Sequence, residues 1–97
     1  MKFVPTAIGY LRSDVSGIRQ EWDETQIRSL ASRLGYNLTK TVAFSAKTDD
    51  PVAQLVALAR KMNADAVIAP GLTHFGGAIP RELDRITAVI TVGPDTV

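Results

Sequence analysis

The spacing of apolar residues changes along the chain, and these changes predict strands that alternate with helices. Some short stretches are almost continuously apolar or alternate with polar residues, as strands do. Between them, apolar residues recur at intervals of three and four, as on the buried face of a helix. The pattern predicts strands at residues 3–11, 36–44, 66–69 and 88–92, and helices at about residues 22–34, 51–63 and 80–86.

Residues at the ends of the two longer helices support these boundaries. Gly35 follows the last apolar position of the first helix, where a left-handed C-cap is favoured. Asp50 and Pro51 give the second helix a side-chain cap and a proline in its first turn. Trp22, at the start of the first helix, is interpreted as a packing residue rather than as a binding aromatic.

The order of these elements predicts a mainly parallel sheet with helices on both faces. We expect a single α/β domain over residues 1–97: a three-layer sandwich with four strands in the flavodoxin-like order 2-1-3-4. Loops 12–19 and 70–78 follow the first and third strands. They are therefore expected to face each other across a crevice at the carboxyl edge of the sheet, where ligands of such folds bind.

Composition removes several classes of site. The chain has no cysteine and one histidine, which excludes disulfides, thiolate metal sites and sites with several histidines. We expect no metal and no cofactor. The net charge of +1 supports DNA as a partner only weakly. No apolar run approaches the roughly 20 residues of a membrane helix, and the N-terminus lacks the apolar core of a signal peptide, so we expect no membrane association and a cytoplasmic location.

The first strand carries a family resemblance. Residues 9–14 read Gly-Tyr-Leu-Arg-Ser-Asp, which resembles the Tyr-x-Arg-Val-Ser signature of the serine recombinase (resolvase/invertase) catalytic domain. Residues 64–68 resemble the third strand of that family, residues 72–76 its following loop, and the order of elements agrees over residues 6–93. The resemblance implies a resolvase-like fold and these candidate binding residues: Tyr10, Arg12, Asp14, Gln26, Thr73 and His74.

The same resemblance implies a serine that attacks a DNA phosphodiester and arginines that stabilise the phosphate. Here Asp14 stands at the serine position, with Ser13 one place earlier. The Asp-Arg pair of the third-strand loop is replaced by Thr73-His74, and the second arginine of that loop by Gly77. Near the start of the second helix, acidic residues 49–50 replace another arginine. One arginine among carboxylates is unsuited to phosphoryl transfer.

The sequence therefore favours a degenerate and truncated resolvase-like domain, without strand-exchange activity, that acts as an interaction or assembly module. DNA is one candidate partner. Self-association is expected, because the short third helix leaves apolar surface less covered. Arg12 is expected either to bind an anion or to pair with Asp14, and His74 is expected to be an acid–base group or a solvated or locally hydrogen-bonded residue.

Two alternatives remain open. The first is an active recombinase that uses Ser13 or Ser16 as nucleophile together with Arg12. The second is a small-ligand or nucleotide-binding domain that uses the glycines of residues 71–77. Residues 64–77 are faintly similar to the universal stress protein family, which binds nucleotides, although no Walker lysine follows a strand.

Overall fold

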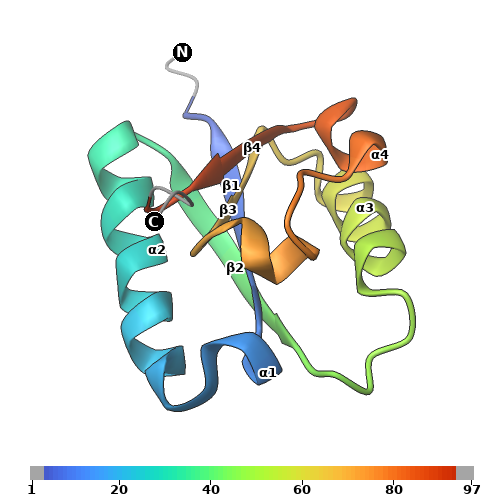
Figure 1. Ribbon diagram of the computed structural model, residues 1–97. Coiled ribbons are helices and arrows are strands. Elements are labelled where there is room, and N and C mark those ends of the chain that lie inside the picture. The colour runs from blue at the N-terminus through green and yellow to red at the C-terminus, as the bar shows by residue number, and fades with distance from the viewer. Residues whose placement is uncertain (1–3, 94–97) are drawn as a thin grey trace.

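Four parallel strands form the central sheet in the order β2-β1-β3-β4, which confirms the predicted topology (Figure 1). The computed structural model describes residues 4–93. Its strands are β1 (Thr6–Arg12), β2 (Asn37–Phe44), β3 (Ala66–Ala69) and β4 (Ala88–Thr91). The register between β1 and β2 shifts between Ala7 and Ile8.

Helices cover both faces of this sheet. Figure 1 shows α2 (Gln20–Leu34) on one side and α3 (Pro51–Met62) with the short α4 (Arg81–Asp84) on the other. The predicted three-layer sandwich is therefore confirmed. No helix within residues 4–93 is long and apolar enough to cross a membrane.

The side chains of β1 divide between the two faces. Ala7 and Leu11 belong to the cluster around Ile27 of α2, whereas Ile8 and Tyr10 belong to the cluster around Leu55 of α3. All four are fully buried, because the strand lies inside the sheet and both of its faces are covered.

The predicted helix ends are confirmed. Gly35 adopts a left-handed conformation with φ of 83°, and its N–H donates to the carbonyls of Ala31 and Ser32. The side chain of Asp50 accepts a hydrogen bond of 3.2 Å from the backbone N–H of Ala53. Both caps satisfy backbone groups that a helix end would otherwise leave unpaired.

The predicted loops were wrong in detail, because they contain short helical turns. Residues 12–19 hold α1 (Ser13–Ser16) and the 3-10 turn η1 (Gly17–Arg19), and the second loop holds η2 (Leu72–Phe75). Turns of three or four residues are too short to show the apolar periodicity that reveals a helix.

Several boundaries moved by a few residues. The first strand begins at Thr6, and Phe3, its predicted start, lies outside the described residues. Helix α2 begins at Gln20, two residues before the predicted start, while α4 is shorter than predicted. The interpretation of Trp22 as a packing residue is wrong: it is 56% exposed, because it points away from the side of α2 that buries Ile27.

Candidate functional site

A cavity of about 350 Å³ lies at the carboxyl edge of the sheet, between the segments that follow β1 and β3. This is the crevice that the strand order predicts. Its polar lining comes from both segments: Ser16, Arg19 and Asp23 on one side, and Gly71, Thr73 and His74 on the other.

Arg12, at the end of β1, is bound by Asp14. The guanidinium Nη2 lies 2.6 Å from Oδ2 of Asp14, and Nε lies 3.1 Å from Oδ1. The carboxylate therefore accepts from Nε and Nη2, the two parallel donors with which an arginine binds a phosphate in a bidentate manner. Arg12 is expected from the sequence either to bind an anion or to pair with Asp14, and the structure shows the pair with Asp14.

The two candidate serines donate to protein acceptors. Ser13 Oγ donates to the carbonyl of Phe44 at the end of β2, at 3.2 Å. Ser16 is buried, and its Oγ donates to Oδ2 of Asp23 at 2.6 Å. The hydroxyl of Ser13 thus ties α1 to β2, and that of Ser16 ties α1 to α2.

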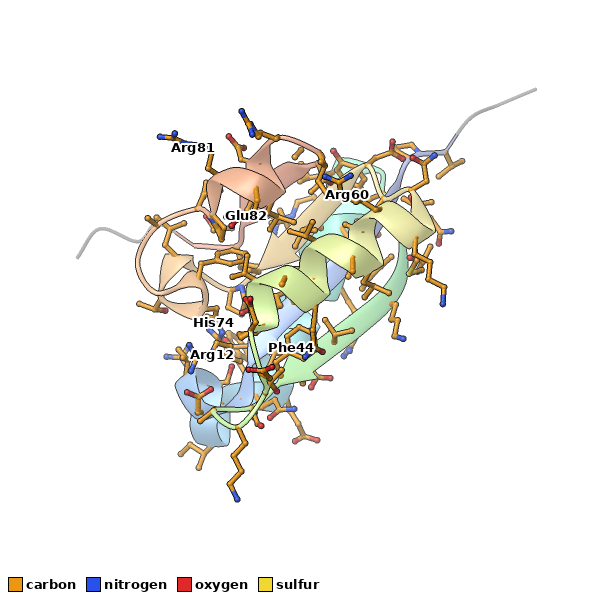
Figure 2. The ribbon with its side chains drawn as sticks, turned by 90° about the vertical axis from the view of Figure 1, so that its right-hand side faces the viewer. Arg12, Phe44, Arg60, His74, Arg81 and Glu82 are labelled. Carbon is orange, nitrogen blue, oxygen red and sulfur yellow. The ribbon has the colours of Figure 1, made fainter. Side chains whose placement is uncertain are left out.

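His74 joins the second loop to the end of β1. Its side chain is buried, Nδ1 accepts a hydrogen bond of 2.9 Å from the backbone N–H of Arg12, and its carbonyl accepts one of 2.8 Å from the hydroxyl of Tyr10. Figure 2 shows Arg12 and His74 together at this end of the molecule. Because Nδ1 is an acceptor, it carries no proton. His74 is therefore hydrogen-bonded rather than solvated, and its partner is distant in the sequence instead of local, so the ring holds two separate segments together.

Tyr10 is a core residue beneath the cavity. Its ring stacks on Phe75, with centroids 4.9 Å apart, and meets the edge of Phe44 at 5.8 Å. Burial raises the pKa of Tyr10 above its ordinary value of 10.0; the positive charge of Arg12 lowers this pKa and the negative charge of Asp14 raises it. The phenol therefore stays neutral and donates to His74.

The raised pKa of Tyr10 predicts a loss of stability in alkali. Because the pKa of Tyr10 is higher in the folded chain than in the unfolded chain, its contribution to the stability of the fold is fully present below about pH 10, the unfolded value. This contribution is lost as the pH rises through the folded value. We expect a late step in the tyrosinate absorbance titration that is absent from Tyr10→Phe. A wild-type titration with the same midpoint as that of the variant and twice its amplitude would contradict this.

The structure gathers only some of the candidate binding residues at the cavity. Thr73 and His74 line it, and Arg12 adjoins it through its bond to His74. Tyr10 is fully buried, and Gln26 lies on α2 beside buried Ile27, outside the cavity lining.

Sequence reasoning missed Arg19 and Asp23 as cavity residues. Asp23 is seven positions from Ser16, a spacing that indicates no contact unless η1 is known to fold the segment back. In the sequence, Asp23 only suits the positive end of the α2 dipole.

The Arg12–Asp14 pair predicts a gain of anion binding when its carboxylate is removed. Asp14→Asn frees the guanidinium, and we expect inorganic phosphate to bind about fivefold more tightly, since an exposed charge contact contributes about 1 kcal/mol. The measurement is a phosphate titration followed by NMR at the Arg12 side chain. Asp84→Asn on α4 removes the same charge outside the cavity lining and is expected to change nothing. An equal response of both variants would contradict the prediction.

A parallel four-stranded sheet in the order 2-1-3-4, with a site at the carboxyl edge between β1 and β3, places this chain in the flavodoxin-like class of α/β domains. Within that class its structure resembles the C-terminal catalytic domain of ISC1926 TnpA, an IS607-like serine recombinase, with a TM-score of 0.73. The two sequences are 12% identical, and the match covers 95% of this chain and 70% of that one. No family model and no curated protein matches the chain.

The likeness to the recombinase confirms the expected resemblance at the level of the fold. This chain has the α/β fold of a serine recombinase catalytic domain. A fold hosts many functions, so what this domain does has to be argued from the site.

Proposed function

We propose that this recombinase-like domain does not exchange DNA strands and that it serves as a cytoplasmic interaction or assembly module. The observation that carries the proposal is the bidentate Arg12–Asp14 pair. Strand cleavage of the recombinase type needs a hydroxyl nucleophile beside a guanidinium that stabilises the phosphate. Here a carboxylate stands at the position that the resemblance gives to the nucleophile, and it neutralises the guanidinium.

The remaining polar groups support the same conclusion. Each serine near the edge donates its hydroxyl to a protein acceptor, Ser13 to Phe44 and Ser16 to Asp23. Arg19 lines the cavity together with Asp23, so a phosphate placed there would meet a carboxylate as well as a guanidinium. This balance of charge does not favour the extra negative charge of a phosphoryl-transfer transition state.

A cleavage assay on supercoiled plasmid tests the proposal. We expect the wild-type chain to produce no nicked or linear DNA above the level of Arg12→Ala. Asp14→Ser, which restores a hydroxyl at the position of the implied nucleophile, shows whether that single change is enough for cleavage. Cleavage by the wild-type chain that disappears in Ser13→Ala or in Ser16→Ala would overturn the proposal in favour of an active recombinase.

A second candidate function is the binding of a small polar ligand, and the cavity favours it. Its lining combines a guanidinium, a carboxylate, a hydroxyl and a buried imidazole, a mixture that suits a small molecule with both donors and acceptors. Addition of nucleotides to isotopically labelled protein tests this candidate. Chemical-shift changes on both sides of the cavity, in residues 15–23 and 70–78, would support it, and unchanged shifts there would count against it.

A further inference from the structure

The outward side of the first long helix carries an exposed stripe. Ile18, in η1, is fully exposed at 104%, and Trp22 is exposed by more than half. Thr25 and Ser29 are also exposed and continue the series at intervals of three and four residues. We call these four residues the outer stripe. It lies opposite the side of α2 that buries Ile27, so nothing in the described part of the chain covers it.

Ile18 and Trp22 are unusual because they are two large apolar residues that are exposed only four positions apart in the sequence. Single exposed apolar side chains are common in small domains, whereas two so near each other in the chain indicate a surface used for contact.

Exposed charges of opposite sign flank one side of the stripe. Glu21 lies toward the start of α2 and Arg28 lies two turns further on. Seven residues of helix separate them by about 10 Å along the axis, so they do not pair within one helix. Nη2 of Arg28 donates to Oγ1 of Thr25 at 3.1 Å, which draws the guanidinium toward the middle of the stripe.

Two copies of this charge arrangement are complementary when their α2 helices run antiparallel. In two antiparallel helices packed face to face, residues on the same flank meet. Glu21 then faces the partner's Arg28, and Arg28 faces the partner's Glu21. Thr25 falls midway between the two pairs, where its small side chain permits close approach of the helices.

We propose that the outer stripe binds a second copy of this chain, with the two α2 helices antiparallel about a two-fold axis near Thr25. Ile18 and Trp22 pack on the C-terminal half of the partner's helix, and the two Glu21–Arg28 contacts set the register. This inference deepens the proposed function, because it rests on the chain's being an assembly module and names the surface and the partner.

The size of the surface predicts a weak dimer. A helix of 15 residues is about 22 Å long. One such helix with the preceding turn provides an interface at the small end of specific complexes. We expect a dissociation constant between about 1 µM and 1 mM, and one that increases with salt concentration because the flanking charges are exposed.

Sedimentation equilibrium of the whole chain, with charge reversal, tests the proposal. Glu21→Arg and Arg28→Glu, each alone, place like charges together twice in the symmetric dimer, and we expect each to weaken it about tenfold. The double variant Glu21→Arg/Arg28→Glu restores opposite charges and is expected to recover most of the affinity. Ile18→Ser/Trp22→Ser should abolish the dimer. Circular dichroism verifies that each variant is folded.

Arg60→Glu is the matched control. Arg60 is exposed in the last turn of α3, on the other face of the sheet, and its reversal changes the net charge as Arg28→Glu does. Its reversal is expected to leave the dimer unchanged.

The possible results separate this inference from the proposed function. A chain that remains monomeric at millimolar concentration would overturn the inference, as would a dimer that responds to neither Glu21 nor Arg28. Plasmid cleavage by the wild-type chain would instead overturn the proposed function, whether or not the chain forms the dimer.

Discussion

Tyr10→Ala is expected to lower the free energy of unfolding by about 3–5 kcal/mol, the range found for aromatic residues removed from cores. Tyr10 is fully buried between Phe44 and Phe75, and its hydroxyl holds the second loop through the carbonyl of His74. The substitution leaves a cavity in the cluster on the α3 side and also removes that hydrogen bond. Such a loss is a large share of the total stability of a small domain.

Tyr10→Phe separates the two contributions. It keeps the ring and removes only the hydroxyl, so we expect a loss of about 1 kcal/mol. Urea denaturation followed by far-UV circular dichroism is the suitable measurement, since exposed Trp22 is a poor fluorescence reporter of the core. Equal losses for the two variants would show that the ring contributes little and would contradict the packing described here.

Gly9→Ala is expected to destabilise the fold by about 1–3 kcal/mol through overpacking. A Cβ at Gly9 would lie 2.8 Å from Oγ1 of Thr41 and 3.0 Å from Cγ2 of Ile27. The first contact comes from the neighbouring strand and the second from α2, so the glycine allows this helix to pack closely on the centre of the sheet.

Two controls define the cause of that loss. Gly93→Ala introduces the same methyl group where no atom lies within 4 Å, and we expect almost no change. Thr41→Ala removes both Thr41 atoms that the new methyl group would meet, so the double variant Gly9→Ala/Thr41→Ala should be more stable than the sum of the single changes implies. Strict additivity in this cycle would contradict the steric explanation.

Much of the fold could be predicted because local signals agreed with one another. The apolar run of residues 66–69 matches β3 at both ends, and the caps at Gly35 and Asp50 lie where glycine and an Asp-Pro pair indicate them. Alternation of strands and helices then leaves few topologies, and the observed strand order is the one expected.

The loops could not be predicted to the same degree, because tertiary contacts define them. His74 is buried only because β1 ends beneath η2 and offers the N–H of Arg12. Asp23 contacts Ser16 only because Gly17, with a positive φ of 58°, and the 3-10 turn η1 interrupt the helix between them. Trp22 resembles a packing residue by type, but its position on α2 turns it toward solvent.

The relation between fold and site explains the proposed function. The sheet of this chain resembles that of a recombinase catalytic domain at 12% identity, so the buried pattern tolerates extensive change. A catalytic site tolerates much less, because charge and geometry must both match the transition state. Asp14 pairs with Arg12 at the end of β1, and the proposed loss of cleavage rests on this neutralised guanidinium.

The most direct test of the central claim is the search for a covalent protein–DNA adduct after the wild-type chain is incubated with supercoiled plasmid and denatured. We expect no adduct by denaturing electrophoresis and mass spectrometry, because Arg12 is paired with Asp14 and the nearby serine hydroxyls donate hydrogen bonds to protein acceptors. An adduct on Ser13 or Ser16 of the wild-type chain that is lost in the corresponding alanine variant would contradict the claim.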